Sequence, residues 1–205
     1  MTEPRPKMTR DLNSEFLAIH EFIPTARDAC TDEAWEYLIG GTETETTVAR
    51  NRAALDALAI RPRVLVDVSE IDKSSDFLGK PCRLPVMLAP VGGLESFHPE
   101  GALAVAKAAE AFGVPTMMSS VSPRSKDEVR AATTNSAIFQ LYVRGGDRFI
   151  EDHVEESMQA GFDAFALTVD VAVYSRRERD IVRRFDKPWR RWVNPESIRA
   201  QAALN

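Results

Sequence analysis

The chain has 205 residues, of which 44% are hydrophobic and 28% are charged, a globular composition that excludes a disordered chain. The length favours one domain with a sizeable core. The formal net charge is −5, with 26 Lys and Arg against 31 Asp and Glu, so the chain would repel a phosphate backbone and we expect no nucleic-acid partner.

A helical segment opens the chain. Trp35, Leu38 and Ile39 share one helical spacing, a Gly-Gly pair then stops that helix, and TTVARNRAALDAL at 46–58 predicts a second helix. We therefore assign residues 1–63 to a helical N-terminal segment that leads into the rest of the fold.

Four apolar runs follow, separated by polar turns and helical stretches. The runs are LPVMLAP at 84–90, VPTMMSS at 114–120, AIFQLYV at 137–143 and AFALTVD at 164–170. A strand–helix unit repeated in this way predicts a parallel sheet, because each crossover helix has to pack back onto the strands that it joins.

The helices between these runs have their own boundary signals. Gly113 ends the first helix, and Ser125 opens the second with the spacing of a capping box. The third helix is expected to bury a stripe formed by Ile150, Val154 and Met158.

Two parallel architectures compete, an open doubly wound sheet and a (β/α)8 barrel. The open sheet is usually marked by G-x-G-x-x-G after its first strand, whereas the first run here continues as APVGGLESF. In the last two runs one face is apolar, and the other becomes polar toward the strand end through Gln140, Tyr142, Thr168 and Asp170. In a barrel the apolar face meets the helices and the polar residues line the mouth, where active sites of this fold lie.

We therefore predict an α/β fold of the (β/α)8 TIM-barrel type, truncated to about its first four β/α units. A complete barrel typically needs about 250 residues. Residues 64–185 are assigned to the first half of the barrel and residues 186–205 to a variable loop or tail after the fourth strand.

The remaining composition gives no sign of secretion or of metal binding. Cys30 and Cys82 lie outside any C-x-x-C or His-rich setting, so we expect neither a disulfide framework nor a metal site. The N-terminus lacks the apolar core of a signal peptide, and no run approaches the length of about 20 apolar residues that spans a bilayer. The sequence predicts a soluble cytoplasmic protein without membrane contact.

Each polar residue at a strand end also has a structural interpretation. A lone Gln or Thr can satisfy neighbouring backbone, an Asp can cap a turn, and the charged run RRERD at 176–180 is typical of a solvated helical face. The convergence of several such residues on one rim is what indicates a site.

The ordered motifs resemble those of the FMN-dependent 2-hydroxy-acid oxidoreductases, the group of glycolate oxidase, lactate oxidase, lactate dehydrogenase and mandelate dehydrogenase. The matching segments are EYLIGGTETE, RPRVLVDVS, LPVMLAP, HPEGALAVAKAAEAFG, SSVSPRSKDEV, FQLYV and GFDAFALTVD followed by RRERD. Each segment alone is a modest match, but they follow the family's order from about residue 35 to residue 186, which makes the resemblance specific.

The resemblance implies FMN as the cofactor and a small 2-hydroxy acid as the substrate. It assigns contacts with the flavin to Ala89, Pro90, Val91, Ser119, Gln140 and Thr168. It assigns the substrate carboxylate to Tyr37 and Arg177 and the substrate hydroxyl to Tyr142, and it makes Asp170 the carboxylate that supports a catalytic histidine. Tyr142 and Asp170 are therefore the catalytic residues implied for this chain, and no metal is implied.

The departures from the family concern the substrate pocket and the missing half. Val91 stands where the family commonly has Thr, and Val121 stands where some relatives have an aromatic residue, so substrate size is open. The family's flavin-contacting lysine, catalytic histidine, second arginine and phosphate-binding loops are expected in a C-terminal half that this sequence does not contain.

Three hypotheses follow from this pattern. The first is the N-terminal half of an FMN-dependent 2-hydroxy-acid oxidase or dehydrogenase, inactive alone, and either homo-oligomeric when complete or completed by another chain. The second is a different flavin-binding or phosphate-binding barrel enzyme, and the third is a noncatalytic interaction protein that uses the half-barrel surface. The electron acceptor of the first, whether oxygen, a quinone or a cytochrome, stays open.

Overall fold

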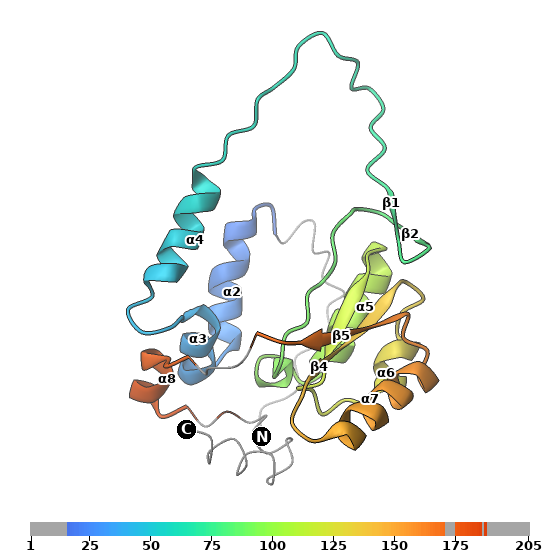
Figure 1. The fold of residues 1–205 in the computed structure, drawn as a ribbon. Helices are drawn as coiled ribbons and strands as arrows, with labels where there is room; N and C mark the ends of the chain where they lie inside the picture. Colours follow the sequence, from blue (N-terminus) through green and yellow to red (C-terminus); the bar gives the residue numbers. More distant parts are fainter. Residues whose placement is uncertain (1–15, 171–174, 186, 188–205) are drawn as a thin grey trace, which may run out of the picture.

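The computed structural model describes residues 16–170, 175–185 and 187 (Figure 1). The tail assigned to 186–205 therefore lies outside the described residues, apart from Lys187. The elements in chain order are η1 (Ile19–Glu21), α2 (Phe22–Ala29), α3 (Asp32–Ile39), α4 (Thr46–Asp56), β1 (Ser75–Phe77), β2 (Lys80–Cys82), η2 (Leu94–Ser96), α5 (Ala102–Phe112), β3 (Thr116–Ser119), α6 (Lys126–Ala131), β4 (Ala137–Tyr142), α7 (Asp147–Gln159), β5 (Ala164–Thr168) and α8 (Glu178–Arg183).

A three-stranded parallel sheet in the order β3-β4-β5 forms the centre of the fold. Three of the four predicted runs are therefore strands. The first run contributes only a parallel bridge between Leu88 and Thr116 beside β3. Its two prolines, Pro85 and Pro90, have no N–H to donate, which limits ladder formation in this run.

The core lies between the sheet and helices α5 to α7. Phe139 and Leu141 of β4 are buried in one cluster with residues of α5, β3 and α6. This confirms that the apolar face of β4 meets the helices. Burying a side chain of this size contributes about 1.5–3 kcal/mol to folding.

The helix boundaries follow the sequence signals closely, with one correction. Gly113 ends α5 in the left-handed region at a φ of 80°, and the Ser125 hydroxyl caps α6 by accepting a hydrogen bond from the Glu128 N–H at 3.0 Å. The stripe expected on α7 is wrong at Met158, which is 70% exposed, whereas Ser157 is buried. Ser157 tolerates burial because its hydroxyl donates to the Val154 carbonyl at 2.8 Å.

Helices α2 to α4 form the predicted helical lead-in, and α3 contacts α8. Between α4 and the short antiparallel hairpin β1–β2, residues 57–74 form a link without regular secondary structure, which Figure 1 shows as a long excursion away from the sheet. Apolar side chains in this link are exposed, among them Ile60 at 96% and Val64 at 82%. The division between segments at residue 63 falls inside this link and stays a prediction.

No helix in the described part of the chain combines the length and apolarity needed to cross a membrane.

Candidate functional site

The carboxyl ends of the three parallel strands bring several predicted site residues side by side. Ser119 of β3 pairs in register with Gln140 of β4, and Tyr142 of β4 pairs with Thr168 of β5. The Gln140 amide Nε2 donates a hydrogen bond to the Thr168 hydroxyl. The sheet therefore places these polar residues on one rim, as the strand pattern predicted.

Gln140 has an unused acceptor at this rim. The residue is 5% exposed, and no described residue donates a hydrogen bond to its Oε1 atom. A buried acceptor without a donor costs about 1–3 kcal/mol, which marks a position where a ligand can supply the donor. Ser119 is also buried, and because its Oγ accepts from the Val121 N–H at 3.2 Å, its own proton is available to a ligand acceptor.

The segment after the first run lies against the same rim. The Gly93 N–H donates to the Val121 carbonyl at 2.8 Å, which holds the loop that follows Val91 next to the end of β3. A Cβ on Gly92 would lie 3.0 Å from the Val121 Cβ, so the close approach depends on a glycine. Val91, which is exposed, lines the same cavity as Ser119.

The two residues expected to bind the substrate carboxylate are in direct contact. The Arg177 guanidinium carbon lies 4.2 Å from the centroid of the Tyr37 ring, and Arg177 Nη2 donates to the Tyr37 carbonyl at 2.6 Å. Burial raises the pKa of the Tyr37 hydroxyl, the Arg177 charge opposes this rise, and Tyr142 adds to it electrostatically. Tyr37 and Arg177 therefore contact each other although they come from separate segments, whereas Tyr142 is placed by its register with Thr168 at the end of β4.

The charged run that was interpreted as a solvated face is partly buried, which corrects that prediction. Asp180 is buried, and its Oδ2 atom lies 3.0 Å from Lys187 Nζ and 3.9 Å from Arg177 Nε. Lys187 Nζ in turn lies 5.2 Å from the centroid of the Tyr37 ring. Sequence reasoning missed the pair of Asp180 and Lys187, because the burial of Asp180 depends on the packing of α8 against α3.

Asp170 lies just beyond the end of β5 and is exposed. The apolar face of the last run was expected to meet the helices, but its members Leu167 and Val169 are also exposed, so that prediction is wrong at these two positions. The exposure has a simple cause: β5 is the edge strand of the sheet, and the core cluster extends only as far as Phe165 along this strand. The role assigned to Asp170 stays a prediction.

The polar rim fits the edge of a flavin ring. That edge carries both an N–H donor and carbonyl and ring-nitrogen acceptors, and the rim offers the unused Gln140 acceptor together with the Ser119 hydroxyl. Gln140 and Ser119 thus offer an acceptor and a donor that fit the ring of FMN, and Thr168 supports Gln140 through its hydrogen bond. In the described part of the chain, no group of three His, Cys, Asp or Glu side chains is placed to hold a metal ion.

Comparison with known proteins identifies the same group. The sequence model of the FMN-dependent dehydrogenase family matches residues 26–203. Glycolate oxidase 1 of Zea mays is 37% identical over 174 residues, which are 85% of this chain and 47% of that protein. Glycolate oxidase of Spinacia oleracea is 36% identical over 174 residues, with the same shares of the two chains.

Solved structures agree with the sequence relatives. A crystal structure of mandelate oxidase with benzoyl-formic acid superposes with a TM-score of 0.79 and 35% identity, covering 85% of this chain and 52% of that chain. The fold is therefore about half of a TIM barrel, and the chain spans about half the length of the curated relatives that it matches. With the family model covering most of the chain and both comparisons in agreement, the chain belongs to the FMN-dependent dehydrogenase family, whose cofactor is FMN.

Proposed function

We propose that this chain provides the N-terminal half of the active site of an enzyme that oxidises a small L-2-hydroxy acid to the 2-oxo acid. The observation that supports this most directly is the buried, unused Oε1 acceptor of Gln140 at the rim shared by Ser119 and Thr168. When bound, FMN supplies a hydride acceptor for this reaction.

The residues of this chain would bind and orient the substrate. Arg177 and Tyr37 offer a cation and a hydroxyl to the substrate carboxylate, a group that guanidinium binds strongly. Tyr142, which lies in register with Thr168 at the strand ends, would bind the substrate hydroxyl oxygen. Asp170 would stabilise the positive charge of a histidine base after that base has taken the hydroxyl proton, without itself acting as the base.

A complete site needs residues beyond this chain, in our proposal. The chain spans about half of its relatives, and no catalytic histidine is assigned to it. We propose that the complementary half of the barrel completes the site, supplied within a homo-oligomeric cytoplasmic protein or by another chain. The exposed Leu167 and Val169 at β5 support the presence of such a neighbour.

Complementation tests this proposal. The chain would be co-expressed with the C-terminal half of the Zea mays glycolate oxidase, and bound FMN would be measured by its visible absorbance. Anaerobic addition of glycolate, L-lactate or (S)-mandelate would then test for bleaching of the flavin. We expect the chain alone to be colourless, and the complemented chain to be yellow and bleached by at least one of the three acids.

Two outcomes would contradict the proposal. A stable complex of the two halves that binds no FMN would favour a noncatalytic interaction protein. A yellow preparation of residues 1–205 alone that turns over a hydroxy acid would show that no second half is needed.

A further inference from the structure

We propose that Arg179 is a positioning residue for the substrate-carboxylate site, because it clamps the segment that contains Tyr37 onto α8. This inference rests on the proposed function in so far as Tyr37 binds substrate. The clamp itself is a feature of this chain alone and does not depend on a bound cofactor.

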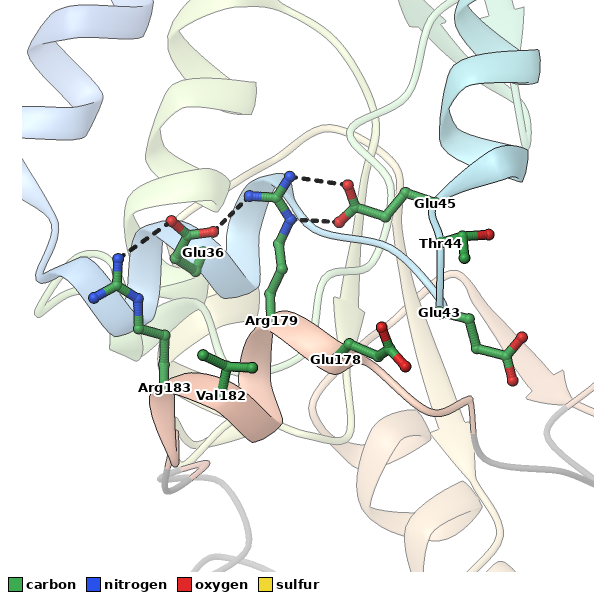
Figure 2. A pocket seen from close by; sticks show the side chains of 8 residues that line it. All are labelled: Glu36, Glu43, Thr44, Glu45, Glu178, Arg179, Val182 and Arg183. Atoms are coloured by element: carbon green, nitrogen blue, oxygen red, sulfur yellow. Dashed lines mark hydrogen bonds and ion pairs between the residues drawn. The ribbon is translucent and has the colours of Figure 1, made fainter.

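Arg179 joins two carboxylates from different parts of the lead-in (Figure 2). Its Nε and Nη2 atoms bind the two oxygens of Glu45 at 2.5 and 2.9 Å, and its Nη1 atom binds Glu36 Oε2 at 2.6 Å. Arg183 reaches the other oxygen of Glu36 at 3.6 Å. A two-pronged contact of this kind fixes the orientation of the guanidinium as well as its position.

The clamp holds a strained turn between α3 and α4. Glu43 and Glu45 have φ angles of 48° and 61°, a region that side-chain-bearing residues seldom adopt. Glu45 precedes α4 but does not cap it, and its carboxylate instead accepts from the Gly41 N–H at 3.1 Å and from Arg179. A Cβ on Gly40 would lie 2.9 Å from the Arg179 Cδ, so the arginine passes directly over this turn.

The contact of α3 with α8 and the residues before it also fixes Tyr37. Glu36 immediately precedes Tyr37 on α3, and Arg177 lies two residues before Arg179. Arg177 donates to the carbonyls of Tyr37 and Gly40 while its guanidinium lies over the Tyr37 ring. The clamp therefore holds both partners of the predicted carboxylate site in one arrangement.

Loss of the Arg179 charge would weaken the contact of α8 with Glu36 and Glu45. Hydrogen bonds from Arg179 hold the pKa values of Glu36 and Glu45 below their ordinary values, so both carboxylates are charged at neutral pH. Without the guanidinium, two negative groups would face each other across the turn, and the turn would be left with the hydrogen bonds from Arg177 to the Gly40 carbonyl and from the Glu43 N–H to the Arg176 carbonyl. We expect Tyr37 to move out of contact with Arg177 as a result.

Fluorine NMR of the full chain labelled with 3-fluorotyrosine tests this directly. The sequence has three tyrosines, and Tyr37→Phe would identify the Tyr37 signal by its disappearance. In Arg179→Gln we expect this signal to move at least half of the way to its position in the urea-unfolded chain. The pKa of the Tyr37 hydroxyl should also fall toward its ordinary value, because burial is what raises it.

Matched variants control for a general loss of structure. Arg176→Gln removes a neighbouring arginine that is 67% exposed and pairs with Glu178 at 3.9 Å, so the Tyr37 signal should not move. Arg179→Lys keeps the positive charge but not the two-pronged guanidinium contact. The Tyr37 signal should therefore lie between its positions in the unaltered chain and in Arg179→Gln. If Arg179→Gln does not fold, as judged by circular dichroism and the Tyr142 signal, Glu45→Gln removes one arm of the clamp and should shift Tyr37 in the same direction.

The inference fails if the signal and the pKa of Tyr37 are unchanged in folded Arg179→Gln. This result would leave the proposed function intact, because the NMR experiment needs neither FMN nor a second half. Conversely, a shifted Tyr37 in a complemented protein that oxidises no hydroxy acid would refute the proposed function and keep the clamp. In an active complemented protein, Arg179→Gln should raise KM about 10-fold and change kcat by less than about 2-fold, the pattern of lost substrate binding.

Discussion

The central strand β4 and the link at 57–74 are both rich in apolar residues, yet those of β4 are buried and those of the link are exposed. In β4, Phe139 and Leu141 are buried by neighbouring strands on either side and by helices above them. In the link, Ile60 and Val64 are exposed, and the segment runs away from the sheet (Figure 1). An apolar pattern in the sequence thus indicates that a segment needs a surface to pack against. The segment is buried only where the fold provides that surface.

The largest expected effect comes from shortening one buried side chain in β4, compared with shortening one exposed side chain in the link. Phe139→Ala should lower the free energy of unfolding by about 3–5 kcal/mol, because it removes a ring and leaves a cavity. Leu65→Ala in the link, where the side chain is exposed, should change this free energy by less than about 0.5 kcal/mol. Urea denaturation of both variants measures the difference, and equal losses would show that the link is packed in solution.

A smaller effect separates two serines with local hydrogen bonds. Ser125→Ala removes the cap of α6 and should cost about 1 kcal/mol. Ser74→Ala in the link removes a 2.7 Å hydrogen bond to Asp72 that joins only neighbouring residues, and it should cost less than about 0.5 kcal/mol. Thermal unfolding followed by circular dichroism would measure both changes, and a larger effect at Ser74 would contradict the contrast between the two regions.

The smallest expected effect concerns acid. Glu110 of α5 accepts hydrogen bonds from the Thr134 N–H at 2.7 Å and from the Thr133 hydroxyl at 3.0 Å, and these bonds, led by that from the Thr134 backbone, lower its pKa from 4.5. A carboxyl group whose pKa is lower in the folded than in the unfolded state stabilises the fold at pH values above its ordinary pKa. This stabilisation is lost as the pH falls through the lowered pKa. Stability should therefore decline below pH 4.5, and Glu110→Gln should weaken this decline.

The link offers the matched control for this pH dependence. Asp72 also has a lowered pKa, caused by Ser74, but its hydrogen bonds stay within two residues of the chain. Because bonds between residues two apart can also form in the unfolded chain, the pKa of Asp72 should differ little between the two states, and Asp72→Asn should leave the pH dependence of global unfolding unchanged. Urea denaturation between pH 3 and pH 7 would check both variants. If stability declines at acid pH as much in Glu110→Gln as in the unaltered chain, Glu110 does not contribute to the decline.

The sheet region was largely predictable from sequence because its signals are local and mutually consistent. Alternation in 137–143 identified the apolar face that contains Phe139, and turn signals at Gly113 and Ser125 located two helix ends. The same alternation predicted that Gln140 and Thr168 share a rim, which their hydrogen bond confirms.

The remaining features depend on contacts between distant segments, which periodicity does not encode. The sequence shows that Arg179 is basic and that Glu45 is acidic, but not that packing of α8 against α3 brings them together. Burial of Asp180 has the same origin. The first apolar run formed only a bridge because of its prolines, a local signal that was outweighed by the apparent repeat of strand and helix.

The most direct test of the central claim, that the strand-end polar residues bind the flavin ring, is FMN titration of the complemented chain with Gln140→Leu. Leucine removes the unused buried acceptor but also the hydrogen bond from Gln140 Nε2 to Thr168, so the two effects oppose each other and the free energy of unfolding of the chain alone should change by less than about 1.5 kcal/mol. FMN binding should nevertheless weaken about 10-fold, the loss of roughly one hydrogen bond. A folded Gln140→Leu variant that binds FMN as tightly as the unaltered sequence would contradict the account.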